Sequence, residues 1–239
     1  MKNFIYRCKS TLLAAPLMLF TLGVSAQQAN TASAVRGIDA AVAARIDHVV
    51  SYSVTEHYAV YRGGDESKPA AEMTVRTDYR KDQGKNYTIL AQSGSSLLRN
   101  QLLGSVLDNE KQMSLPGTRE TVLINSANYR MELKSAATQP LDGHDCLVLA
   151  LTPRRNSPSL FQGTLWVDAH NFNIVQLEGT AAKSHSFLTG PAQVLRQYAP
   201  VAGFPMAAHA RATSKSSLLG MTTIKIDYSG YQVQLTPGS

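Results

Sequence analysis

The stretch that decides the fold is residues 50–60, which read VSYSVTEHYAV. Its apolar and aromatic residues fall mostly on even positions, and the polar residues between them are Ser51, Ser53, Thr55 and His57. Successive side chains of a strand point to opposite faces, so this period of two predicts a long, half-buried strand. Residues 72–80 alternate in the same way, and 87–91 follow the turn residues Asp82-Gln83-Gly84. The three segments together predict an antiparallel meander with one wet face.

Further strands are expected along most of the remaining chain. The predicted segments are 129–134, 146–151, 161–168, 174–179, 193–198, 207–213 and 224–235. Residues 146–151 are apolar at every position, so we expect this strand to be covered on both faces. The alternation of the last strand changes phase after Ser229-Gly230, which predicts a bulge or a sharp bend at Gly230.

Two segments have helical rather than strand periodicity. Residues 37–49 place Ile38, Val42, Ile46 and Val49 on one face at helical spacing. The second helix is predicted over 95–109. Its apolar residues cover a wide arc and are Leu97, Leu98, Leu102, Leu103, Val106 and Leu107. Such an arc fits an ordinary core helix as well as a helix that lies across a sheet above a cavity.

The first 26 residues resemble a secretory signal. Lys2, Arg7 and Lys9 precede an apolar stretch from Leu12 to Val24, and Val24-Ser25-Ala26 supplies a small-x-small end, so cleavage is expected after Ala26. The alternative is a retained N-terminal anchor, although the stretch is shorter than the roughly 18 apolar residues of a membrane span. Residues 27–36 are expected to form a flexible tail, and 37–239 a single domain. The signal predicts a periplasmic, bacterial location.

Charge and cysteine content limit the partners. The net charge of the whole chain is +6, and removal of the signal would halve it, because the signal holds three basic and no acidic residues. No Lys/Arg cluster remains that would indicate nucleic acid, so none is expected as a partner. Cleavage would also remove Cys8 and leave Cys146 alone, which predicts a buried and inert thiol.

The residue patterns that accompany catalysis are missing from the sequence. The histidines contain no His-x-x-x-His pair, and there is neither a Gly-x-Ser-x-Gly elbow nor a Gly-rich phosphate loop before a helix. Asp142, His144 and Asp145 crowd around Gly143, but a polar turn before the next strand explains them better than an acid/base or metal cluster. We therefore predict no enzyme, no metal site and no cofactor.

Two neighbouring stretches carry a family resemblance. Residues 141–149 read LDGHDCLVL and are followed by Leu151-Thr152-Pro153-Arg154. Residues 161–168 read FQGTLWVD and are followed by 174–179, IVQLEG. This pair, at this spacing, resembles the bacterial outer-membrane lipoprotein-sorting proteins, the LolA/LolB-like superfamily.

The resemblance implies a fold and a binding mode. The expected fold is mainly β (α+β): a single incomplete, strongly curved antiparallel β-barrel with helices covering its concave face. The cavity between sheet and helices would hold acyl chains by apolar area, with few polar anchors. The candidates for lining it are Leu98, Leu102, Val106, Leu149, Trp166 and Val175. An arginine that holds the covering helix is expected from the best-studied carriers, and Arg76, Arg80 and Arg99 remain open alternatives.

Three functions follow as hypotheses. The first is a soluble periplasmic carrier that binds lipid or lipoprotein acyl chains and meets partner proteins at the inner or outer membrane. The second is a periplasmic sensor or protein-interaction module on the same fold, because fold alone does not fix function. The third is a hydrolase, against which the missing catalytic residues argue.

Overall fold

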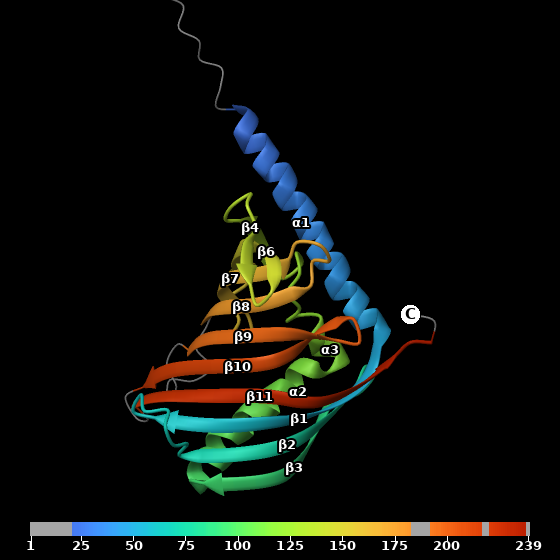
Figure 1. Cartoon of the computed structure of the whole chain (residues 1–239). Helices are drawn as coiled ribbons and strands as arrows, with labels where there is room; N and C mark the ends of the chain where they lie inside the picture. The colour runs from blue at the N-terminus through green and yellow to red at the C-terminus, as the bar shows by residue number, and fades with distance from the viewer. Residues whose placement is uncertain (1–20, 183–191, 217–219, 238–239) are drawn as a thin grey trace, which may run out of the picture.

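The computed structural model of the chain describes residues 21–182, 192–216 and 220–237. Of the expected signal, only 21–26 fall in this part, and 1–20 lie outside it. Within the described residues, eleven strands form one antiparallel sheet with the order β3-β2-β1-β11-β10-β9-β8-β7-β6-β4, and β5 pairs with β6 (Figure 1). Since β3 and β4 are the two edges, the sheet is not closed.

Ten of the strands among the described residues occupy the segments that the alternation predicted, most of them with longer bounds, and the short β5 was not predicted. The strands are β1 (Val49–Arg62), β2 (Ala71–Arg80), β3 (Gly84–Gly94), β4 (Tyr129–Leu133), β5 (Gln139–Leu141), β6 (His144–Pro153), β7 (Phe161–Asp168), β8 (Ile174–Ala181), β9 (Ala192–Val201), β10 (Phe204–Ser216) and β11 (Gly220–Leu235). The expected irregularity in the last strand is confirmed, because Gly230 has φ +68° and the β1–β11 register shifts between Ser53 and Thr55.

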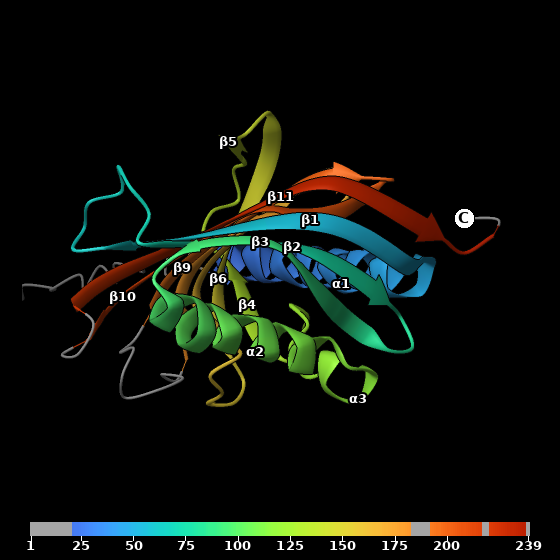
Figure 2. The ribbon, with the colours of Figure 1, turned by 90° about the horizontal axis from the view of Figure 1, so that it is seen from below.

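The helical segments are α1 (Thr21–His48), the π-helical η1 (Leu98–Leu103), α2 (Gly104–Ser114) and the short α3 (Pro116–Arg119). Helix α1 begins earlier than predicted, so residues 27–36, expected as a flexible tail, are helical. The physical reason is packing: Ala34 is buried against the sheet one turn before Ile38, and this contact extends the helix toward the N-terminus. Figure 2 shows α1 and α2 on the same side of the sheet, beneath its arch.

In the part of the chain that the structure describes, two separate apolar cores hold these elements together. In the first, Ala34 and Ile38 of α1 pack on β4, β6, β7 and β8 around Leu149, Leu165 and Leu177. In the second, η1 and α2 pack on β1, β2 and β11. Each helix therefore stabilises a different part of the sheet, and β9 and β10 lie between these two parts.

Two glycines face each other across the β7–β8 pair. Gly163 of β7 and Gly179 of β8 are register partners. A Cβ on Gly163 would collide with the backbone of Glu178, and one on Gly179 with the backbone of Gln162. Only glycine permits this close approach of two strand backbones.

Candidate functional site

A large cavity lies between the sheet and the helices. Its volume is about 1030 Å³, and its lining includes Leu98, Leu102 and Val106 of η1 and α2 as well as inward-facing residues of β1 and of β8–β11. This volume is at the upper end of the range of small-molecule sites, roughly 300–1000 Å³. Within the described residues, it is the feature of the molecule best suited to hold a ligand.

The cavity exists because the middle strands carry small side chains on their inner face. Ala192 of β9, Ala210 and Ala212 of β10, and Ala181 of β8 all line it. Val194 is the register partner of Ala212, and Arg196 of Ala210, so small side chains of β10 lie beside the inward-facing residues of β9. An open sheet of this curvature needs large side chains, a helix or a ligand to fill it, and these strands supply few large side chains.

Charged residues cross the cavity in one connected group. The Glu110 carboxylate on α2 accepts hydrogen bonds from Lys85 Nζ of β3 at 2.8 Å and from an Arg196 Nη of β9 at 2.9 Å. Arg196 also lies over the ring of Phe161, 5.6 Å from its centroid. Because β3 is an edge strand and β9 lies near the middle of the sheet, Glu110 ties α2 to both sides of the hollow.

The environment keeps all three members of this group charged. The Lys85 ammonium lowers the pKa of Glu110 to about 2, against the opposing effect of burial. Burial acts to lower the pKa of Lys85, but Glu110 and neighbouring tyrosines outweigh it, and the pKa lies well above its usual value. Burial also acts to lower the pKa of Arg196, but the Glu110 carboxylate outweighs it, and the pKa is raised above its usual value. These three residues, which we call the charged triad, are thus ionised throughout the physiological pH range.

A second carboxyl group faces the cavity without a salt bridge among the described residues. Glu56 of β1 is only 1% exposed, and its Oε2 accepts a hydrogen bond from the Tyr58 hydroxyl. Its Oε1 has no hydrogen-bond partner among the described residues. Glu56 belongs to the cavity lining and has Val75 and Tyr228 as its register partners on the neighbouring strands.

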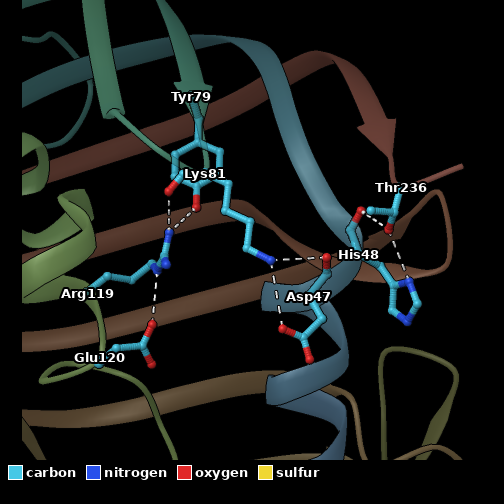
Figure 3. Close-up of polar contacts among 7 residues, drawn as sticks. All are labelled: Asp47, His48, Tyr79, Lys81, Arg119, Glu120 and Thr236. Atoms are coloured by element: carbon cyan, nitrogen blue, oxygen red, sulfur yellow. Dashed lines mark hydrogen bonds and ion pairs between the residues drawn. The ribbon is translucent and has the colours of Figure 1, made fainter.

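Polar contacts tie the helices to the sheet at the end of the cavity where α1 passes into β1 (Figure 3). Arg119 of α3 donates to the Tyr79 hydroxyl at 2.8 Å and to the Lys81 carbonyl at 3.0 Å. Lys81 Nζ donates to the Asp47 carbonyl at 3.2 Å. The three contacts join α3, the end of β2 and the last turn of α1, so they fix the C-terminal end of the α2–α3 segment.

Of the residues expected to line a cavity, the structure brings together those of the Leu-rich helix. Leu98, Leu102 and Val106 all belong to the lining. Leu149 instead lies fully buried in the first core, and neither Trp166 nor Val175 is among the lining residues. Trp166 pairs with Val148 and Gln176 on the face opposite Leu165, and Val175 sits at a β-bulge. Strand alternation thus directs Trp166 away from the cavity.

The sequence did not reveal the polar residues of the site. The candidates for an arginine that holds the covering helix were Arg76, Arg80 and Arg99, and none of them belongs to the cavity lining, whereas Arg196, which contacts α2, does. Arg76 and Arg80 form exposed ion pairs with Asp78 and Asp82. Only Glu56 could have been noticed in the sequence, because it is a carboxylate among the apolar residues at even positions of 50–60.

The polar residues around Gly143 form a turn between β5 and β6, as predicted. Asp142 and Gly143 have φ of +49° and +82° and join β5 to β6. His144 Nδ1 lies 2.7 Å from Asp168 Oδ2, and Asp168 also accepts the backbone N–H of His170 at 2.8 Å. Among the described residues, no group of three or more acidic, histidine or cysteine side chains is arranged to hold a metal.

Cys146 is a free and fully buried thiol, as expected. Burial, aided by the Asp168 carboxylate, raises its pKa to about 11. A thiol with so high a pKa is a poor nucleophile. In the part of the chain that the structure describes, no helix combines the length and apolarity that crossing a bilayer requires.

Comparison with known proteins gives structural likenesses only. No protein-family model matches the chain, and no curated protein sequence matches it. Among solved structures, a LolA superfamily protein from Nitrosomonas europaea is similar at 17% identity, over 87% of this chain and 94% of that one, with a TM-score of 0.42. An outer-membrane lipoprotein-sorting protein domain from Vibrio parahaemolyticus is similar at 10% identity, over 88% and 92%, with a TM-score of 0.43.

A DUF1329 family protein from Desulfovibrio piger is similar at 13% identity, over 89% of this chain and 94% of that one, with a TM-score of 0.42. Residues 141–179 carry a sequence resemblance to the same group of proteins that two of these structures are named for. The function proposed below depends on the residues of the cavity and not on these likenesses.

Proposed function

We propose that this protein binds the acyl chains of a lipid or lipoprotein in the cavity between its sheet and its helices, and carries them through the periplasm. The observation that carries the proposal is the cavity itself, about 1030 Å³ in volume and lined at one end by Leu98, Leu102 and Ile224. Removing an acyl chain from water gains about 25 cal/mol per Å² of apolar surface buried. An apolar hollow of this size therefore suits a long hydrocarbon chain.

The helices have a defined part in this proposal. Helix α2 with η1 covers the concave face of the sheet, and the charged triad anchors it there. The cavity opens when Glu110 releases Lys85 and Arg196, because these contacts join α2 to β3 and β9. The N-terminal signal of residues 1–26 directs the protein to the periplasm, where acyl chains in transit need shielding from water.

Native mass spectrometry with lipid extraction tests the proposal on protein purified from its own periplasm. A co-purifying phospholipid or acylated protein is the expected result. The same measurement on Val194→Trp, which fills part of the cavity from β9, is expected to lose the adduct. Gln193→Trp is the matched control, because Gln193 is the adjacent residue of β9 and is exposed. An adduct that survives Val194→Trp would place the ligand elsewhere.

A sensor or interaction module is the second candidate, and one feature favours it. The edge strand β3 exposes Ile89 and Leu90, which are 52% and 55% accessible. An open edge with apolar side chains is suited to pairing with another chain. A pull-down from periplasmic extract that recovers one defined protein, lost in Leu90→Lys, together with a cavity free of lipid, would favour this function over the carrier.

A further inference from the structure

The unpartnered carboxyl oxygen of Glu56 lies inside the cavity. Glu56 is 1% exposed, and Oε1 has no hydrogen-bond partner among the described residues. Buried polar atoms are almost always paired, and leaving a buried carboxyl oxygen unpaired costs more than a neutral group would. An acceptor in this position is therefore suited to a donor that the ligand brings.

Neighbouring side chains leave Oε1 open. Tyr58 donates to Oε2, and burial together with Glu56 raises the pKa of Tyr58 far above its usual value, so its hydroxyl remains a donor at all relevant pH values. The inward-facing cations Lys85 and Arg196 are engaged by Glu110. The register partners of Glu56 are Val75 and Tyr228, and neither contributes a hydrogen bond to it among the described contacts.

Along β1, the cavity lining has an apolar part under η1 and a polar part around Glu56, and it becomes polar again beyond Val60, at Arg62. On β1, Tyr58 and Val60 belong to the apolar core under η1, together with Ile226 of β11. Two residues closer to the start of β1, Glu56 lies in the part of the cavity that Lys85 and Glu110 also line. Such a division fits one amphiphile lying lengthwise, with its hydrocarbon tail under η1 and its head beside Glu56.

The charges around Glu56 indicate what kind of head this is. The cavity lining includes two carboxyl groups, Glu56 and Glu110, and six basic side chains, which are Arg45, Arg62, Lys85, Arg119, Arg196 and Arg211. A cationic head would meet this excess of positive charge, whereas an uncharged donor would not. Arg45 Nε is also buried without a partner among the described residues, so the same part of the lining offers a donor for a carbonyl oxygen.

We propose that the polar part of the cavity around Glu56 is a head-group subsite, in which Glu56 Oε1 accepts a hydrogen bond from an uncharged N–H or O–H donor of an acylated ligand, such as the N–H of an acyl amide. The inference rests on the proposed acyl-binding function and adds to it a preference among acyl ligands. A ligand with the same chain and no donor leaves Oε1 unpaired and binds more weakly.

Two probes that differ only in the group beside the carbonyl, N–H in one and oxygen in the other, test this preference. N-methyldodecanamide and methyl dodecanoate share chain length and carbonyl group, and only the amide has an N–H. Their affinities are measured by displacement of a fluorescent acyl probe from the full chain. Glu56→Gln is the informative variant, because Tyr58 would hold the new carbonyl and direct the new NH₂ at the ligand, which replaces an acceptor by a donor.

The expected result is a selective loss. Glu56→Gln weakens binding of the amide about tenfold or more, as for loss of a buried hydrogen bond, and changes binding of the ester by less than about twofold on the same scale. Glu72→Gln is the matched control on the opposite face of the sheet and is expected to change neither, because Glu72 is paired with His57 there and is half-exposed. Equal effects of Glu56→Gln on both probes overturn the subsite.

A comparison within the wild-type protein covers the case in which Glu56→Gln does not fold. N,N-dimethyldodecanamide keeps the carbonyl and lacks the N–H, so it is expected to bind about tenfold more weakly than N-methyldodecanamide. Equal affinities of the two amides overturn the subsite and leave acyl binding intact. Failure of every probe to bind the wild-type protein overturns the acyl-binding function itself, so the two failures are distinct.

Discussion

Replacement of Glu110 by glutamine tests the charged triad most directly. Glutamine keeps the shape of the side chain but removes the charge that balances Lys85 and Arg196. The Glu110 pKa of about 2, against an ordinary value of 4.5, corresponds to about 3 kcal/mol of stabilisation of the ionised form. The Glu110 side chain is 21% exposed, so solvent screening is partial. We expect Glu110→Gln to lower the free energy of unfolding by about 2–3 kcal/mol at pH 7.

The pH dependence of this contribution has a definite sign. A carboxyl group whose pKa is lower in the folded than in the unfolded state stabilises the fold above its unfolded pKa. That stabilisation is lost as the pH falls through the folded value. The contribution of Glu110 is therefore complete above about pH 5 and is lost progressively toward about pH 2. In Glu110→Gln, the decline of stability over this window should be shallower than in the wild-type protein.

Urea unfolding followed by circular dichroism, at pH 7 and at steps down to the lowest pH at which the fold persists, measures both effects. Glu120→Gln is the matched control, because Glu120 forms an exposed ion pair with Arg119 and is 58% accessible. Exposed pairs contribute about 0–1 kcal/mol, so this control should change stability by less than about 1 kcal/mol. A change of that small size in Glu110→Gln, with an unaltered pH profile, would refute the role assigned to the triad.

Three further predictions follow from single contacts. Gly179→Ala should destabilise the protein by about 1–3 kcal/mol in thermal unfolding, because a Cβ collides with the backbone of Gln162, whereas Gly117→Ala, with open space around it, should be nearly neutral. Cys146 should react with a soluble disulfide reagent at pH 8 at least about a hundredfold more slowly in the folded protein than in urea, since its pKa is raised to about 11 and it is fully buried; rapid labelling of the folded protein would contradict this. Arg119→Met removes two hydrogen bonds to β2 and the residue after it and should cost about 1–2 kcal/mol in urea unfolding, and an unchanged midpoint would show that α3 is held by other contacts.

Much of the sheet was predictable because strand alternation is a local signal. Residues 50–60 and 72–80 carry a period of two, and each became a strand whose even or odd positions face inward as a set. The bulge at Gly230 followed from a change of phase that is visible in the sequence alone. The start of α1 was not predictable in this way, since residues 27–36 have no helical stripe and their helicity depends on Ala34 meeting strands more than ninety residues away.

The candidate site was predictable only in its apolar part. Leu98, Leu102 and Val106 were found because the arc of one helix can be read from spacing. The triad joins residues 85, 110 and 196, which come from three elements, and no local pattern relates them. The place of Trp166 could not be predicted for a related reason: alternation shows that it faces away from Leu165, but not which of the two faces of β7 meets the cavity.

The charged triad is difficult to explain by stability alone. Buried ion pairs gain little over apolar residues of similar size, because desolvation offsets the attraction between the charges. An apolar residue at position 110 would, however, allow α2 to sink toward the small side chains of β8–β10 and fill the hollow. The long side chains of Lys85 and Arg196 reach Glu110 from opposite sides. They hold α2 away from the sheet by the length of a side chain. We infer that the triad keeps the interior of the cavity unfilled at the cost of packing, which is consistent with a fold whose core is completed by a ligand.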